Sequence, residues 1–120
     1  MKVIYSNKSV EGVCTDTKKA FKLIKDKKIV LSLFAVINDI SNATIIEDIT
    51  SKKRYRFHGL EGNLKNSFSI TIQNRTKWRL IIKLLDENSK EFIPCDIPKI
   101  RKLIKIIKIE KVSDHYDDIY

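Results

Sequence analysis

Cysteine, glycine, proline and tryptophan are all scarce in this chain of 120 residues, with two, three, two and one copies. The two cysteines, Cys14 and Cys95, stand neither in a C-x-x-C pair nor at a Cys-to-His spacing, so no local motif indicates a zinc site or a redox pair. We interpret both as small buried hydrophobes. A metal site that the fold assembles from them with His58 and His115 is the alternative, and we predict no metal.

The few glycines also argue against nucleotide-binding loops. Gly59 and Gly62 fit the spacing of neither a P-loop nor a dinucleotide fingerprint. The sequence has no serine-elbow motif, no paired-carboxylate signature and no Cys-His context for a nucleophile. Enzyme classes that depend on these motifs therefore have little support.

Long apolar runs are absent as well. No run is long enough to span a bilayer, and no basic-then-apolar leader with a small-residue cleavage site is present. We therefore predict a cytoplasmic protein with no membrane partner and no small-molecule cofactor. The length suits a single domain over residues 1–120, large enough to bury roughly two thirds of the surface of its unfolded chain.

Positive charge is abundant and unevenly distributed. The formal net charge is +9, and residues 51–111 hold sixteen Lys and Arg against six Asp and Glu, which gives +10. Residues 112–120 carry −3. Such a field favours a polyanionic partner, and nucleic acid is the commonest one in a cytoplasm. Lysines that merely keep an isoleucine-rich protein soluble are an equally weighted alternative.

The first half of the chain predicts a short strand followed by helices. Residues 1–6 alternate as in a strand. Thr15 or Asp16 can cap a helix that is interrupted at residues 25–28, and a second helical pattern runs from residue 30 to 40. Two helices packed as a hairpin and one long bent helix both fit this pattern. A further short turn is expected around residues 43–49.

The clearest pattern lies in residues 56–86. Residues 68–73 alternate apolar and polar side chains, which predicts a half-buried strand, and residues 78–85 alternate in the same manner. The polar segment between them predicts an antiparallel hairpin with a short basic loop. This hairpin brings together three cations: Arg75, Lys77 and Arg79.

The segments on either side are less regular. Residues 55–58 alternate and are expected to form the strand that delivers His58. Residues 87–99 contain both prolines and predict a loop. The density of isoleucine predicts a strand over residues 105–112. A helix that begins near Asp96 and Pro98 is the alternative for residues 97–106.

Two parts of the sequence carry a resemblance to a known family. A spaced His-Leu-Gly, an aromatic-Ser-Ile strand and a Trp-Arg pair resemble the HigB-type branch of the RelE/ParE toxins of bacterial toxin-antitoxin pairs. The ending EKVSDHYDD is similar to the Asp-Tyr-His close of that family, with the last two residue types exchanged. The match covers about half of the chain. The matching residues are His58, Leu60, Gly62, Phe68, Ser69, Ile70, Trp78, Arg79, Asp114, His115 and Tyr116.

The resemblance implies both a fold and an activity. The fold is α+β, with two N-terminal helices packed on a small, mainly antiparallel twisted sheet, the RelE-like microbial RNase fold. The activity is that of an mRNA interferase, which cuts the messenger in the ribosomal decoding site by metal-independent attack of a 2′-oxygen. The implied partners are the ribosome, mRNA and a cognate antitoxin protein. That antitoxin could cover the hairpin or grip the helical face of residues 30–40.

The resemblance also assigns roles to residues. It places the functional histidine at His58, as a general acid or base, and the phosphate-binding arginine at Arg79. His115 and Tyr116 complete the catalytic set. Neighbours in an extended segment point to opposite sides, so these two reach the same phosphate only if the strand has already ended. RNA contacts are expected from Arg56, Lys65, Arg75, Lys77 and Asp114.

Each assignment has a structural alternative. His58 can be hydrogen-bonded in a loop, and Arg79 can be an exposed strand residue paired with Glu61 or Asp86. Tyr116 can belong to the stem of an acidic tail. At the level of function, the alternatives are a ParE-like DNA gyrase poison, which needs no catalytic histidine, and a non-catalytic basic module that binds RNA or a protein partner.

Overall fold

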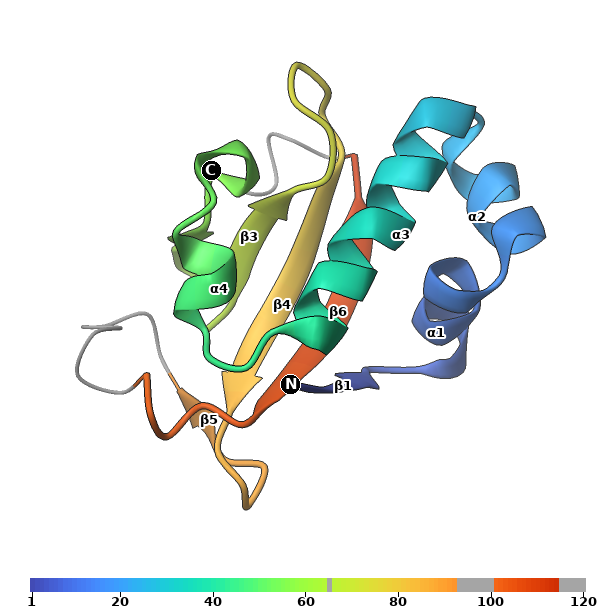
Figure 1. Ribbon diagram of the computed structural model, residues 1–120. Helices are drawn as coiled ribbons and strands as arrows, with labels where there is room; N and C mark the ends of the chain where they lie inside the picture. Colours follow the sequence, from blue (N-terminus) through green and yellow to red (C-terminus); the bar gives the residue numbers. More distant parts are fainter. Residues whose placement is uncertain (65, 93–100, 115–120) are drawn as a thin grey trace.

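The computed structural model describes residues 1–64, 66–92 and 101–114 and shows an α+β architecture (Figure 1). The described strands form one mixed sheet of six strands in the order β1-β6-β4-β3-β2, with β5 paired to β4. β1 runs parallel to β6, and the other pairs are antiparallel. The strands are β1 (Lys2–Tyr5), β2 (His58–Gly59), β3 (Phe68–Thr71), β4 (Arg79–Leu85), β5 (Glu91–Phe92) and β6 (Ile106–Ser113).

Helices fill the chain between β1 and β2. They are α1 (Lys8–Thr15), α2 (Thr17–Ile24), α3 (Lys27–Asn42) and α4 (Glu47–Thr50), followed by the 3-10 turn η1 (Lys53–Tyr55). A second 3-10 turn, η2 (Gly62–Leu64), follows β2. The structure thus has three helices before residue 43, where the sequence predicted two helices or one long bent helix.

Side-chain caps explain where these helices begin. Asp16 caps α2, as predicted, and Asp26 caps α3, each by accepting backbone N–H groups of the first turn. Lys25 adopts a left-handed conformation (φ 61°) and ends α2, so the two helices are separate. The sequence reading missed α1, although the side chain of Asn7 accepts the N–H of Val10 at 2.9 Å.

Helix α3 lies across one face of the sheet, with α1 and α2 beside it (Figure 1). Its buried apolar face packs into a core with alternate residues of β4, namely Leu80, Ile82 and Leu84. The helical face of residues 30–40 is therefore interior, and a partner cannot grip it without unpacking the core. Its buried residues are Val30, Leu33, Val36, Ile37 and Ile40.

The opposite face of the sheet, which we call the distal face, is also covered. All four residues of β3 are buried, including Ser69 at 0% exposure, so the prediction of a half-buried strand was wrong. Part of the reason is that residues 60–64, 66 and 67 fold back: the N–H of Leu60 donates to the carbonyl of Ser67 at 2.9 Å. Leu60 and Leu64 then pack on Ile81 in a second small apolar cluster.

The segment before His58 is not the strand that was predicted. Residues 53–55 form η1, and pairing begins only at His58. The hydroxyl of Tyr55 donates to the carboxylate of Asp39 on α3, which holds the turn against the helix. Arg56 then takes a left-handed conformation (φ 46°) that ends the turn. Tertiary anchoring of Tyr55 thus outweighs the local alternation.

The C-terminal half confirms one prediction and changes another. The isoleucine-rich segment is a strand, β6, and a turn at residues 101–103 precedes it. The loop predicted for residues 87–99 contains β5, because the Asp86 carboxylate accepts the N–H groups of Asn88 and Lys90 and closes a tight turn. Residues 93–100, with Cys95 and the alternative helix start, lie outside the described residues.

Candidate functional site on the distal face

The pairing register places His58 and Arg79 on the same face of the sheet. His58 lies opposite Ser69, which lies opposite Ile81. Thr71, two residues along β3, lies opposite Arg79. Residues directly opposite in a pair project to the same side, and so do residues two apart in one strand. His58 and Arg79 therefore occupy neighbouring rows of the distal face, with backbones about 12 Å apart across two strands.

A backbone contact orients the ring of His58. Its Nδ1 lies 2.7 Å from the carbonyl oxygen of Arg56. A carbonyl can only accept, so Nδ1 carries the proton, and in the neutral ring the lone pair is on Nε2. The left-handed conformation of Arg56 positions this carbonyl. The Nε2 atom itself is buried.

The guanidinium of Arg79 is nearly buried, with the residue 4% exposed. Its Nη1 donates to the carbonyl of Thr76 at 2.6 Å and to that of Trp78 at 2.9 Å. These two hydrogen bonds hold the Arg79 side chain against the β3–β4 loop. The alternative in which Arg79 is an exposed strand residue was wrong.

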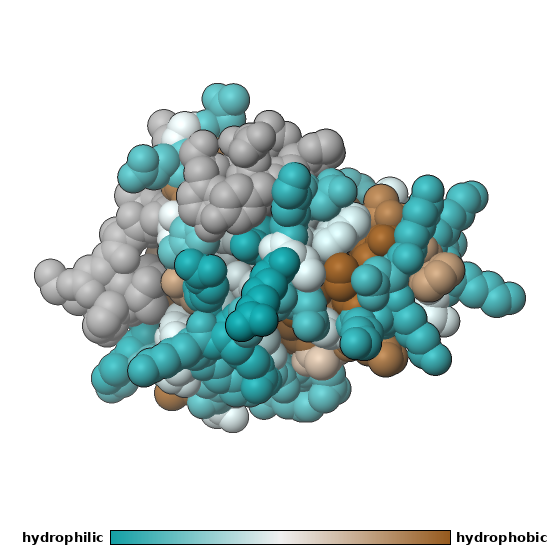
Figure 2. Space-filling model, turned by 90° about the horizontal axis from the view of Figure 1, so that it is seen from above, coloured by the Kyte–Doolittle hydropathy of each residue, from teal (hydrophilic) through white to brown (hydrophobic). Residues whose placement is uncertain are grey.

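The other predicted cations are on the surface. Arg56, Arg75 and Lys77 are exposed, and Arg75 takes a left-handed conformation (φ 67°) in the β3–β4 loop. Figure 2 shows that this end of the molecule is mostly hydrophilic, with apolar side chains gathered on the side of the helices. Asp114 is exposed just after β6. Lys65, His115 and Tyr116 lie outside the described residues.

The sequence reading missed cations that the structure adds to this face. Ile81 lies opposite Lys111, and Lys83 lies opposite Lys108. Lys108 and Lys111 are three residues apart, a spacing that regular alternation would place on opposite faces. A register shift between Ile81 and Ile82 leaves Glu110 as the extra residue of a β-bulge and brings both lysines to the distal side. No simple sequence signal marks this bulge.

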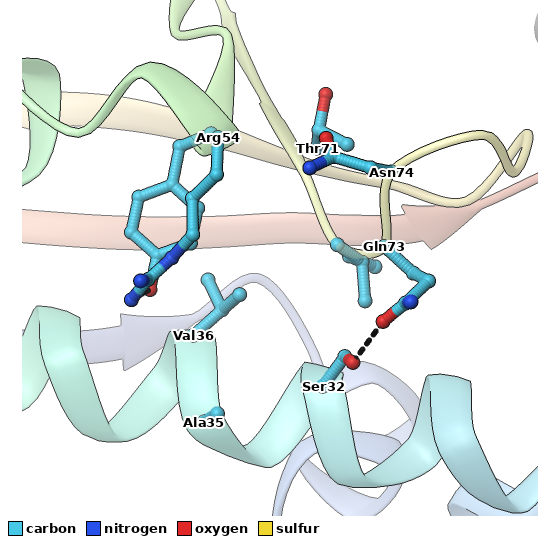
Figure 3. Close-up of a pocket in the computed structure, with 9 residues that line it drawn as sticks. Ser32, Ala35, Val36, Arg54, Thr71, Gln73 and Asn74 are labelled. Carbon is cyan, nitrogen blue, oxygen red and sulfur yellow. Dashed lines mark hydrogen bonds between the residues drawn. The ribbon is translucent and has the colours of Figure 1, made fainter.

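A cavity of about 180 Å³ lies on the other side, between α3 and the end of β3 (Figure 3). The hydroxyl of Ser32 on α3 contacts the amide oxygen of Gln73 at its edge. Arg54, which also lines it, forms an ion pair with Asp39 at 3.2 Å. None of the predicted site residues within the described ranges lines this cavity. We therefore place the candidate site on the distal face.

The described residues contain neither a metal-binding cluster nor a membrane-spanning helix. Within residues 1–64, 66–92 and 101–114, no group of three or more His, Cys, Asp and Glu could hold a metal ion. No helix in the same part of the chain has the length and apolar character needed to cross a membrane.

Comparison with known proteins adds no relative: no family model matches the chain, and no curated protein matches it. The likeness to the RelE/ParE toxins stays a prediction from the sequence.

Proposed function

We propose that this chain is a ribosome-dependent mRNA endonuclease, the toxin of a toxin-antitoxin pair, with a RelE-like microbial RNase fold of the HigB branch. The observation that carries the proposal is that His58 and Arg79 project from neighbouring rows of one sheet face. RNA cleavage needs a group that takes the 2′-hydroxyl proton and a cation that stabilises charge on the phosphate. A histidine and an arginine on one face supply both.

In the proposed reaction, each catalytic residue has one role. The Nε2 atom of His58 takes the proton as the ribose 2′-oxygen bonds to phosphorus, and the bond from phosphorus to the 5′-oxygen breaks. The products are a 2′,3′-cyclic phosphate and a 5′-hydroxyl. Arg79 stabilises the charge on the phosphate oxygens. His115 or Tyr116 protonates the leaving 5′-oxygen.

Access to Arg79 is part of the proposal. Because Arg79 is 4% exposed and the Nε2 atom of His58 is buried, RNA reaches the two groups only after it displaces some of the surrounding side chains. The exposed Arg56, Arg75 and Lys77 make the first electrostatic contacts with the RNA backbone. The charge of +10 on residues 51–111 supports a polyanionic partner.

The proposed setting is the cytoplasm, with the ribosome, mRNA and a cognate antitoxin as partners. The helical face of residues 30–40 is buried in the core, so the antitoxin covers the β3–β4 hairpin instead. Covering this hairpin shields Arg75 and Lys77 from RNA, which would neutralise the toxin.

A second function is favoured by one observation. The Nη1 atom of Arg79 donates to two carbonyls of its own hairpin, which is also what a purely structural arginine does. In this alternative the chain is a non-catalytic basic module that binds RNA, and His58 only fixes the turn at Arg56. Binding would then weaken with salt while no RNA ends appeared.

Induction in cells followed by primer extension on an abundant message tests the proposal. The parent should give discrete cuts within codons, His58→Ala should abolish them, and Lys90→Ala, a change of an exposed residue in the β4–β5 turn, should leave them unchanged. Arg79→Lys should reduce cutting at least tenfold, because it keeps the charge but loses the planar fork. Thermal melts show whether each variant is folded.

The outcomes separate the three functions. Intact message with continued translation in the parent would exclude the endonuclease. Failure of DNA supercoiling with intact message would favour a gyrase poison. Binding to RNA without new ends, unchanged in His58→Ala, would favour the non-catalytic module.

A further inference from the structure

A second cavity, of about 300 Å³, opens on the distal face beside the row that contains His58. Its walls come from residues 63, 64, 66 and 67 and from β4 and β6. Ile81, which lines it, is two residues from Arg79, about 7 Å along β4. The volume is at the lower end of the range for small-molecule pockets, so it suits one nucleoside rather than a large ligand.

Two apolar side chains line this cavity. Leu64 and Ile81 line it, and both belong to the cluster that includes the buried Leu60. A nucleobase has two flat apolar faces and a polar edge, so it can lie against such side chains. A phosphate or a sugar alone would gain little from them.

The other lining residues are polar and carry both signs of charge. Asn63 and Asn66 contribute amides, and Lys83 and Lys111 contribute ammonium groups. The bulge residue Glu110 contributes a carboxylate. Bulges are frequent beside functional sites, where they redirect a side chain, and here the bulge brings Glu110 and Lys111 to the same cavity.

Glu110 has acceptor capacity that the protein leaves open. Its Oε1 atom is buried and has no hydrogen-bond donor among the described residues. The nearest ammonium groups are those of Lys108 at 3.6 Å and Lys83 at 3.8 Å. These distances are beyond a hydrogen bond. An N–H donor that enters the cavity can complete the bonding of Oε1.

We propose that this cavity binds a nucleobase that carries an exocyclic amino group. The carboxylate of Glu110 accepts from the amino group of cytosine, adenine or guanine, as acidic side chains do from the cytosine amino group in DNA grooves. Uracil has a carbonyl oxygen there, which the carboxylate repels. Asn63 and Asn66 bond to the rest of the base edge, and Lys83 and Lys111 attract the phosphate.

The place of this base in a reaction rests on the proposed function. If the chain cleaves RNA, the cavity holds the nucleotide next to the one at Arg79 and contributes to the choice of cleavage site. Base binding itself needs no cleavage. The two ideas can therefore fail separately.

Titration of the folded protein with the four ribonucleoside 5′-monophosphates, followed by NMR of the asparagine side-chain amides, tests the inference. We expect AMP, CMP and GMP to bind at least fivefold more tightly than UMP and to shift the amides of Asn63 and Asn66. Inorganic phosphate should bind weakly and leave these amides in place. Equal binding of UMP, or shifts confined to other residues, would overturn the proposal.

Substitutions of Glu110 and Asn63 test whether this cavity is the source of the base preference. Glu110→Gln should reduce the preference over UMP to less than twofold, whereas Glu87→Gln, in the exposed turn after β4, should keep it. Asn63→Ala removes an exposed amide and should weaken AMP binding at least threefold, while the control Asn38→Ala on α3 should not. If Glu110→Gln fails to fold, unchanged AMP binding by Asn63→Ala suffices to reject the pocket.

Cleavage mapping then separates this inference from the proposed function. A base preference without any RNA cutting would keep the cavity and reject the endonuclease. Cuts that depend on His58 but show the same base preference in the parent and in Asn63→Ala would keep the endonuclease and reject the cavity.

Discussion

Lys83 and Lys108 lie directly opposite each other on β4 and β6, and two carboxylates offset their repulsion. The Nζ atom of Lys83 is 3.1 Å from Oε1 of Glu91. Oε1 of Glu110 lies near both ammonium groups, at 3.8 and 3.6 Å. The short strand β5, which carries Glu91, is therefore held to the sheet by charge as well as by backbone pairing.

Glu91→Gln should reduce the free energy of unfolding by about 0.5 kcal/mol in low salt, because it leaves the two lysines with one carboxylate between them. The loss should shrink in high salt, which screens exposed charges. Urea denaturation at two ionic strengths measures this, with Glu87→Gln as the control. An equal loss at both ionic strengths would show that the contact is not electrostatic.

The link between Asp39 and Tyr55 should appear as a pH dependence of stability. Hydrogen bonds from the Tyr55 hydroxyl and then from Lys52 hold the pKa of Asp39 below its ordinary value of 3.8. A carboxyl group with a lowered folded-state pKa stabilises the protein above that ordinary value, and the contribution is lost as the pH falls through the folded-state pKa. Asp39→Asn should cost about 1 kcal/mol near neutral pH. Urea denaturation of both proteins down to about pH 2 should show the difference vanish; a constant difference would contradict it.

The left-handed residue after α2 offers a stabilising substitution. Lys25 ends the helix with φ 61°, a conformation that glycine adopts without steric strain. Lys25→Gly should therefore raise the free energy of unfolding by about 0.5 kcal/mol. Lys22→Gly, inside the same helix, should lower it by about 1 kcal/mol. Thermal and urea unfolding give both values, and a loss in both variants would contradict the assigned helix end.

The thiol of Cys14 should be unreactive in the native protein. Burial raises the pKa of this thiol to about 12, and the side chain lies in the core. Only a thiolate reacts rapidly with iodoacetamide, so Cys14 should be alkylated at least a hundredfold more slowly in native buffer than in urea. Peptide mass spectrometry measures the label on Cys14 alone. Rapid native labelling would mean that α1 opens readily.

The exposed cations of the β3–β4 loop should govern the salt dependence of RNA binding, if the proposed function holds. The logarithm of the RNA-binding constant falls linearly with the logarithm of salt concentration. The double variant Arg75→Gln, Lys77→Gln should make this slope about 1.4 less negative for single-stranded RNA. Filter binding over a salt series gives this slope. The control variant Lys18→Gln, Lys22→Gln, on α2, should keep the parental slope.

The parts of the fold that the sequence predicted correctly depend on local pattern. The alternation on both sides of the polar segment at residues 74–77 predicts β3, β4 and their loop, and the isoleucine-rich segment predicts β6. Asp16 predicts the start of α2. The cap at Asn7 was equally local, so α1 could have been found by applying the same rule nine residues earlier.

The parts that were missed depend on contacts between distant residues. The polar side of β3 is buried partly because residues 60–64, 66 and 67 return over it, and no property of β3 itself indicates that. The bulge at Glu110 moves Lys111 to the distal face. A prediction based on regular alternation of side chains therefore misses the cavity. The position of the Arg79 guanidinium depends on loop carbonyls that only the folded hairpin places.

The parallel pairing of β1 with β6 joins residues 2–5 to residues 106–109. A growing chain can therefore complete this ladder only after nearly the whole sequence has left the ribosomal tunnel. Loop closure over such a separation makes folding slow, on the order of milliseconds to seconds by analogy with other chains rich in non-local pairing. During synthesis the backbone groups of β1 that pair with β6 stay without that partner until about a hundred more residues have been made.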